Sequence, residues 1–228
     1  MKHYCVSIVL LLFFLGHSQE NPPTKQYGDK YLEDQFYIGL GFNLLMNKPT
    51  DVAQTSLSYN LQTGFIKDIP FNAKRNFGIG VGFGYATNSY YSNIVATQAN
   101  NTIAYQVGGV EDFRRSKFET HAIELPFELR WRTSNASDYK FWRIYTGAKF
   151  GYVFAGESRL LTELDKSGFS NDDIEKLQYG LMLSFGYNTW NVHAYYSLNP
   201  LLKDDVMING GESIDLRVLR IGVIFYIL

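Results

Sequence analysis

Large apolar side chains alternate with small or polar residues along much of the chain. The clearest case is residues 77–86, FGIGVGFGYA, where every odd position is large and apolar and every even position is glycine or alanine. A period of two is the repeat of a β-strand, whose successive side chains point to opposite faces of the sheet. One face of this strand is therefore apolar. The other must be too crowded for side chains, as in the interior of a small closed barrel.

Similar alternation predicts eight strands in all. They cover residues 35–45, 56–69, 77–86, 119–132, 139–155, 177–187, 191–198 and 216–228. The joins alternate in length: those at 70–75, 133–138 and 188–190 are short, and those at 46–55, 88–118, 156–176 and 199–215 are long. Outer-membrane barrels have short periplasmic turns and long external loops. The sequence thus predicts an all-β fold, an eight-stranded antiparallel transmembrane β-barrel of the outer membrane over residues 35–228, with both chain ends in the periplasm.

Composition agrees with strands rather than helices as the membrane-spanning elements. Aromatic residues make up 16% of the chain, yet the mean hydropathy is only −0.16. The interior of the sequence has no apolar run of about 20 residues, which a membrane-spanning helix needs. Barrels have average hydropathy because half of each strand is polar. The net charge of −1 gives no indication of a nucleic-acid partner.

The first 18 residues have the pattern of a signal peptide. Lys2 and His3 precede an apolar segment at 5–15, and the small residues Gly16 and Ser18 fit cleavage before Gln19. The single cysteine lies in this segment, so we expect none in the mature chain. Residues 19–34, with two prolines and several charges, are predicted to be a short periplasmic lead-in.

A soluble eight-stranded barrel of lipocalin type has the same periodicity, because alternation does not say which face points inward. Charge placement favours the membrane barrel. The charged strand residues fall on the small and polar rows: Glu124, Glu128, Arg130, Arg132, Arg143, Lys149 and Arg220. Glycines on those rows would weaken a solvent-facing strand without gain. Inside a narrow barrel they leave room for long, paired side chains.

These seven residues are predicted to form a charged network in the barrel interior. Pairing across the turn at 133–138 would place Glu128 opposite Arg143, and Glu124 diagonal to Lys149. The network has two interpretations. It is either a plug of ion pairs, since charges withdrawn from water must be paired, or the lining of a polar pore or a buried catalytic carboxylate. An eight-stranded barrel is just wide enough to be filled by its own side chains, which favours the plug.

Motifs for catalysis or cofactor binding are weak. The glycines at 78–84 repeat every second residue and do not lead into a helix, so they do not form a phosphate-binding loop. His121 and His193 lie on different predicted strands, which favours neither a zinc site nor a Ser/His/Asp hydrolase. We therefore expect no enzyme activity, no cofactor and no metal.

The long loops are where partner contacts are expected. Residues 88–118 combine tyrosines and arginines with small polar residues, and the candidate contact residues are Tyr90, Tyr91, Tyr105, Arg114 and Arg115. Tyr90 and Tyr91 fit equally well in the aromatic belt of a membrane barrel. Residues 171–176, NDDIEK, are typical of a capped helical turn.

Four segments resemble the PorT family of porin-like outer-membrane barrels from Bacteroidota. They are residues 36–49 (FYIGLGFNLLMNKP), 57–70 (LSYNLQTGFIKDIP), 123–134 (IELPFELRWRTS) and 139–147 (YKFWRIYTG). The resemblance implies an accessory or assembly factor of type IX protein secretion to the cell surface, and of gliding motility where present, rather than the translocation pore. It implies protein partners in the secretion machinery, and no catalytic residues transfer with it.

Three functions are thus open at the level of sequence. The first is an interaction protein of surface secretion, monomeric in the outer-membrane lipid, that works through its loops. The second is a narrow porin-like passive channel for small solutes. The third, an outer-membrane hydrolase or acyltransferase, has the least support, because the sequence offers no convergent nucleophile and base.

Overall fold

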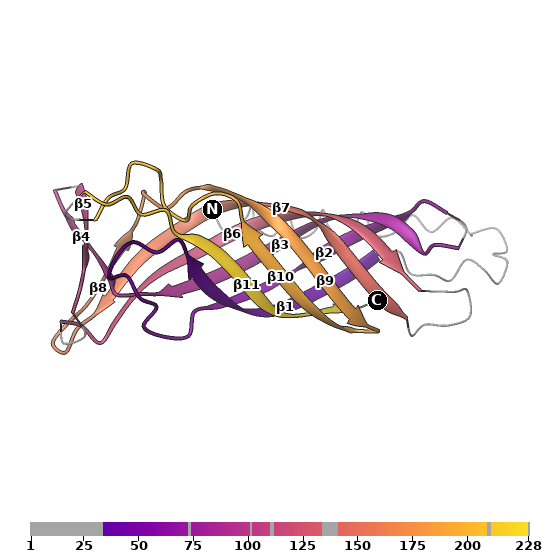
Figure 1. Cartoon of the computed structure of the whole chain (residues 1–228), viewed down its shortest axis with the longest axis horizontal. Helices are drawn as coiled ribbons and strands as arrows, with labels where there is room; N and C mark the ends of the chain where they lie inside the picture. Colours follow the sequence, from indigo (N-terminus) through magenta and orange to yellow (C-terminus); the bar gives the residue numbers. More distant parts are fainter. Residues whose placement is uncertain are drawn as a thin grey trace, which may run out of the picture. The chain divides into compact units, whose positions relative to one another are not determined.

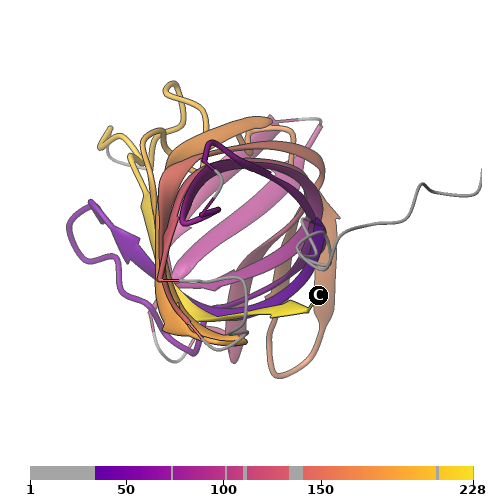
Figure 2. The same ribbon diagram turned by 90° about the vertical axis from the view of Figure 1, so that its right-hand side faces the viewer.

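A closed antiparallel barrel forms the body of the protein (Figures 1 and 2). The computed structural model describes residues 34–72, 74–100, 102–109, 112–133, 141–208 and 211–227. The signal peptide predicted at 1–18 and all but the last residue of the lead-in predicted at 19–34 lie outside this part. Nothing in the described residues forms a helix long and apolar enough to cross a membrane.

Eight strands close the barrel. They are β1 (Asp34–Met46), β2 (Tyr59–Pro70), β3 (Phe77–Tyr91), β6 (Arg115–Arg132), β7 (Trp142–Leu161), β9 (Leu177–Tyr187), β10 (Trp190–Ser197) and β11 (Arg217–Ile227). Around the barrel the order is β6-β3-β2-β1-β11-β10-β9-β7, and the pairing of β6 with β7 completes the ring. The first and last strands pair from Phe36 with Ile227 to Met46 with Arg217. The predicted fold class is confirmed.

The two faces of each strand have opposite surroundings. In β1, buried and exposed residues alternate without interruption. Six large apolar residues from Phe36 to Met46 make up the exposed row, and Phe36 retains 63% of its surface, whereas Gln35 and Asn43 on the other face are buried. A soluble barrel would bury the apolar row, and a protein in water rarely exposes a continuous apolar belt of this kind. The arrangement is that of a barrel in lipid, which excludes the lipocalin alternative.

The joins between barrel strands alternate as the sequence predicts. We call the end with long joins the loop end and the end with short joins the turn end. The turn end has the joins at 71–76, 133–141 and 188–189, together with the last residue of β11. Figure 1 shows the loop end on the left and the end of the chain on the right.

Three strands lie within the long joins, where the sequence analysis expected loops. β4 (Ile94–Ala99) and β5 (Thr102–Val107) form a hairpin between β3 and β6, and β8 (Lys166–Ser170) pairs with the end of β7. β3, β6 and β7 also extend further toward the loop end than predicted, and they continue to pair there. Their alternation continues past the apolar rows, with charged residues on the outer face.

The helical turn predicted at 171–176 is not present, so this prediction is corrected. The segment forms a hydrogen-bonded turn in which the Asp173 backbone N–H donates to Asn171 Oδ1 at 2.9 Å. Ile174 then bridges to Leu202 of another loop. Asn171 therefore makes the side-chain contact expected of a cap, but the long-range bridge replaces the helix.

Candidate functional site

The glycine rows make space for side chains that cross the barrel interior. A Cβ on Gly80 would lie 2.5 Å from Nε of Arg130. A Cβ on Gly84 would collide with the hydroxyl of Tyr37 and lie 2.8 Å from the backbone oxygen of Thr63. The glycines are therefore needed where the interior is already filled by a long side chain from another strand.

The turn-end half of the interior contains one ion-paired group. Arg130 Nε donates to Glu128 Oε2 at 2.8 Å, and Arg130 Nη1 lies 3.7 Å from Asp68 Oδ1. Arg132 pairs with the other oxygen of Asp68. All four side chains are within 1% of complete burial. Since buried charges are stable only when paired, these contacts hold β2 and β6 together from the inside.

Arg143 joins this group through aromatic rings rather than through a carboxylate. Its guanidinium lies 4.6 Å from the ring centre of Phe141 and 5.6 Å from that of Tyr226. Its Nε and Nη1 have no hydrogen-bond partner within the described part of the chain. Such cation–π contacts stabilise a desolvated cation.

The predicted Glu128–Arg143 pair is wrong. Glu128 is opposite Gly147, and Arg143 is opposite Arg132. The prediction assumed that the second strand of this hairpin begins at residue 139, whereas β7 begins at Trp142. Because the length of a connection fixes the register of its hairpin, the longer connection moves every pair along the strand.

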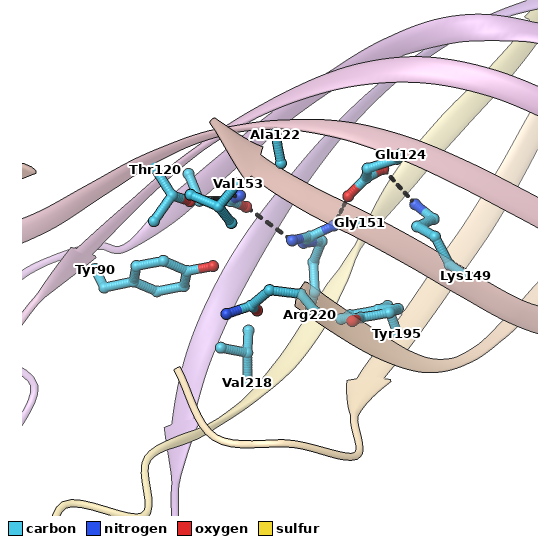
Figure 3. A pocket seen from close by; sticks show the side chains of 12 residues that line it. Tyr90, Thr120, Ala122, Glu124, Lys149, Gly151, Val153, Tyr195, Val218 and Arg220 are labelled. Atoms are coloured by element: carbon cyan, nitrogen blue, oxygen red, sulfur yellow. Dashed lines mark hydrogen bonds and ion pairs between the residues drawn. The ribbon is translucent and has the colours of Figure 1, made fainter. Parts of the chain in front are cut away.

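The loop-end half of the interior contains a second ion-paired group, shown in Figure 3. Lys149 Nζ lies 2.8 Å from Glu124 Oε2, as the sequence predicts, and Arg220 Nη1 lies 3.5 Å from Glu124 Oε1. Amides complete the shell: Lys149 donates to Gln62 Oε1 at 2.7 Å, and Arg220 Nη2 donates to Asn88 Oδ1 at 2.7 Å. Residues from five strands thus meet around one carboxylate.

The space left beside this second group is very small. A cavity of about 20 Å³ is lined by Tyr90, Glu124, Tyr195 and Arg220, among others (Figure 3). A single water molecule needs roughly 10–15 Å³. The cavity therefore has room for about one water molecule and is too small for a solute.

Among the described residues of the interior, cations outnumber carboxylates. The buried carboxylates are Asp68, Glu124 and Glu128, and the buried cations are Arg130, Arg132, Arg143, Lys149 and Arg220. All seven charged residues predicted for the network are buried. Asp68 is the member that the sequence analysis missed. It lies on the same inward row as Asn60 and Gln62, so following the alternation to the end of the strand would have found it.

The two histidines lie in different environments. His193 is buried in the interior, where its Nδ1 is 2.8 Å from Ser184 Oγ, and its Nε2 has no hydrogen-bond partner in the described residues. His121 faces outward, with its Nδ1 2.6 Å from the Tyr85 hydroxyl. A catalytic triad requires a carboxylate that orients the histidine. In the described part of the chain, no carboxylate contacts the Ser184–His193 pair. That part also holds no group of three or more residues suited to bind a metal ion.

A hydrophobic cluster closes the interior at the loop end. We call it the loop-end core; its members include Leu45, Tyr90, Ile94, Tyr105, Phe118, Ile174, Leu202, Ile208, Ile214 and Val218. The residues come from barrel strands, from the β4–β5 hairpin and from the other long joins. Burial of this apolar surface holds the loops over the mouth of the barrel.

Polar contacts fix the loops above the loop-end core. The Tyr105 hydroxyl donates to Asp173 Oδ2 at 2.9 Å, and burial raises the pKa of Tyr105. The Ala53 backbone N–H donates to Asn93 Oδ1 at 2.8 Å, and the Thr50 backbone N–H donates to Glu212 Oε1 at 3.0 Å. Each of the four long joins is therefore tied to at least one other.

Of the residues predicted to contact a partner, some are buried in the loop-end core and others lie outside it. Tyr90 and Tyr105 are buried in the loop-end core, so they are not partner-contact residues, and this part of the prediction is corrected. Tyr90 continues the inward row of β3, a signal already present in the alternation. Tyr91 is on the outward row of β3, but it is buried, with 8% of its surface exposed, and the Arg115 guanidinium lies over its ring; Arg114 and Arg115 are exposed.

A closed eight-stranded barrel with an apolar outer face defines an integral β-barrel protein of the outer membrane. The chain belongs to the family described as outer membrane protein beta-barrel domain, whose model matches residues 17–203. A comparison with curated protein sequences gives no match.

Two solved structures of one protein from Yersinia pestis are similar to the chain. The crystal structure of Ail, the attachment invasion locus protein, is 14% identical, with 84% of this chain and 97% of that chain covered and a TM-score of 0.34. The structure of Ail in complex with the heparin analogue sucrose octasulfate is 12% identical over the same shares, with a TM-score of 0.33.

Proposed function

We propose that this protein is a non-conducting outer-membrane barrel that serves as an accessory or assembly factor in delivering proteins to the cell surface. It works through protein contacts of its loop end, without catalysis or cofactor, and as a monomer in the membrane. The observation that carries the proposal is the crowded interior of the described barrel, where two ion-paired groups are buried beneath the loop-end core and the cavity beside Glu124 is only about 20 Å³.

The filled interior supports an interaction role over a channel. The cavity beside Glu124 has room for about one water molecule. A path for a solute would require the ion pairs on Glu124 and Glu128 to separate inside a low-dielectric barrel, which is costly because each charge would lose its partner.

The loop end has the properties of a preformed contact surface. Its four long joins are linked by the hydrogen bonds and bridges described above, so binding there loses little conformational entropy. Apolar side chains lie exposed on it: Leu164 retains 99% of its surface and Met207 54%. Exposed apolar side chains on an ordered surface favour protein contacts.

Orientation and pathway complete the proposal. Short turns are periplasmic in outer-membrane barrels, so the turn end and the chain termini would lie in the periplasm and the loop end outside the cell. The pathway, type IX secretion in a Bacteroidota cell, rests on the resemblance of residues 36–49, 57–70, 123–134 and 139–147 to the PorT family. Fold alone does not assign this role.

A gene deletion in the source organism tests the pathway. We expect delivery of type IX cargo to the surface and medium to be lost, and the wild-type gene to restore it. A variant with Leu164→Asp and Met207→Asp should reach the membrane folded but fail to restore delivery, because a charge replaces each exposed apolar contact. The measurement is cargo in surface and medium fractions.

The matched control is Lys74→Asp, which places the same carboxylate at the turn end. It should restore delivery to the wild-type level. Normal cargo delivery in the deletion strain would contradict the secretion role, and the narrow passive channel would then be the better hypothesis.

A further inference from the structure

The outer face of the loop end carries a basic groove on four neighbouring strands. Tyr91 of β3, Lys117 of β6, Arg159 of β7 and Gly168 of β8 lie in one row of register partners. The next row on the same outer face lies two residues further from the turn end and contains the partners Arg115, Leu161 and Lys166. Their neighbours in sequence on β6, Ser116 and Phe118, are buried, so these rows point away from the interior.

These rows enclose a groove of about 360 Å³ without an acidic residue in its lining. It is lined by Tyr91, Arg115, Lys117, Arg159, Leu160, Leu161 and Lys166. Four of the seven lining residues are cations. The groove is large enough for a phosphate group with part of its attached sugar, since small-ligand sites begin at roughly 300 Å³.

Two of the four cations are paired with glutamates, Glu119 and Glu157, which are register partners two residues nearer the turn end. Lys117 pairs with Glu119 at 2.5 Å, and Arg159 pairs with Glu157 at 2.7 Å. Arg115 and Lys166 form no ion pair with any described residue. The groove therefore has a net positive charge.

One aromatic ring brings two of these cations together. The Arg115 guanidinium lies 5.5 Å from the ring centre of Tyr91, and Lys117 Nζ lies 5.7 Å from it. Two like charges held beside one ring repel each other, and an anion between them would relieve the repulsion. A phosphate suits this place because arginine binds its oxygens in a bidentate manner and lysine adds a point charge.

The height of the groove relative to the membrane indicates the source of the anion. The rings of Tyr85, His121 and Phe154 lie next to one another in an outward aromatic row, and such rows mark the membrane interface in barrels. Lys117 lies four residues beyond His121 along β6, which is about 10 Å above it for a strand tilted by roughly 40°. The groove thus opens sideways at the level of lipid head groups.

We propose that this groove binds the phosphate groups of an anionic glycolipid of the surrounding outer leaflet. The inference rests on the proposed orientation, with the loop end outside the cell. A sideways opening at head-group level favours a lipid over an acidic protein segment, which would more readily meet the loop end from above. The bound lipid would anchor the β6–β7–β8 sheet beside the membrane.

Titration of the purified full chain in detergent micelles tests this. The probes are diphosphorylated lipid A and the same lipid A with its phosphates removed. Wild-type protein should bind the phosphorylated form more tightly. Arg115→Gln with Lys166→Gln should weaken that binding about 25-fold, since each cation near an anionic lipid surface contributes about 1 kcal/mol. Added salt should weaken wild-type binding in the same direction.

Arg114→Gln with Lys203→Gln is the control, because it removes the same charge from exposed loop-end positions outside the groove. It should change the affinity by less than about twofold at moderate salt. Heat-modifiable gel mobility verifies folding of each variant. If the double variant fails to fold, the single variants Arg115→Gln and Lys166→Gln are titrated, each with about a fivefold expected loss.

The inference would be overturned by equal affinity for the two lipid A forms, by equal loss in the control and groove variants, or by tighter binding of a ten-residue glutamate peptide than of lipid A at this groove. The last would assign the groove to an acidic protein segment. Inorganic phosphate that competes as strongly as the lipid would likewise overturn the lipid as the source. The cargo assay of the deletion strain is independent of all these outcomes.

Discussion

Glu124→Gln is expected to lower the free energy of unfolding of the barrel by about 3–5 kcal/mol, the range for removing one partner of a buried ion pair. Glu124 is the only described carboxylate that contacts Lys149 and Arg220. The glutamine has nearly the same shape, so the packing is kept while two buried cations lose their counter-charge. The measurement is urea unfolding in lipid vesicles, read by tryptophan fluorescence and by heat-modifiable gel mobility.

Glu157→Gln is the matched control. Glu157 pairs with Arg159 at 2.7 Å, but the two side chains are 41% and 40% exposed. Exposed pairs contribute about 0–1 kcal/mol, so this variant should unfold almost as the wild type does. Adding Lys149→Met to Glu124→Gln should recover part of the lost stability, because one unpaired buried cation is removed. Equal effects of Glu124→Gln and Glu157→Gln would contradict a charge-paired interior.

Gly84→Val should lower the free energy of unfolding by about 3 kcal/mol, at the upper end of the usual cost of overpacking. The new Cβ would meet the hydroxyl of Tyr37 and the backbone oxygen of Thr63. The Thr63 oxygen belongs to a paired strand and cannot move aside without breaking the ladder. Urea unfolding in the same vesicles measures the loss.

Gly151→Val provides the comparison at a second inward glycine. The nearest atom to a Cβ there is Gln178 Cβ at 3.7 Å, an ordinary contact. This variant should lose much less stability. Adding Tyr37→Phe should partly rescue Gly84→Val, because the Tyr37 hydroxyl has no hydrogen-bond partner in the described residues. Similar losses for the two valine variants would show that the glycine row is not set by crowding.

The sequence predicted the features that depend on local periodicity. Alternation at residues 77–86 identified β3. The even-numbered positions of this strand point inward, and continuing them toward the loop end leads to the buried Tyr90. The same reasoning placed Glu124 diagonal to Lys149, and their ion pair is present. These features follow from the two-residue repeat, which fixes the face of every residue once one face is known.

The features that depend on long-range packing were not predictable in the same way. The Glu128–Arg143 pair failed because the register across the join at 133–141 depends on the length of that connection, which alternation does not show. The loop-end core joins Tyr105 with Ile174 and Ile208, residues far apart in the chain. No local pattern specifies that these segments meet, and burial of apolar surface over the barrel mouth decides it.

The contacts in the interior also explain how so many charged and polar side chains can be buried inside a barrel that lies in lipid. Arg130, Lys149 and Arg220 would each be costly in a low-dielectric interior, and each is surrounded by carboxylates, amides or tyrosine rings. The ion pairs and hydrogen bonds of such a network rigidify the strands that they join. A rigid barrel holds the loop end in one arrangement, which suits a protein that acts by contact.

Single-channel recording of the full chain in planar lipid bilayers tests the central claim, that the barrel is closed by its own side chains. The claim predicts no conductance steps from protein whose folding has been verified by gel mobility, under conditions in which an open porin conducts. Steady conductance steps whose ion selectivity changes with Glu124→Gln or Arg220→Gln would contradict it, and would identify the interior as a channel.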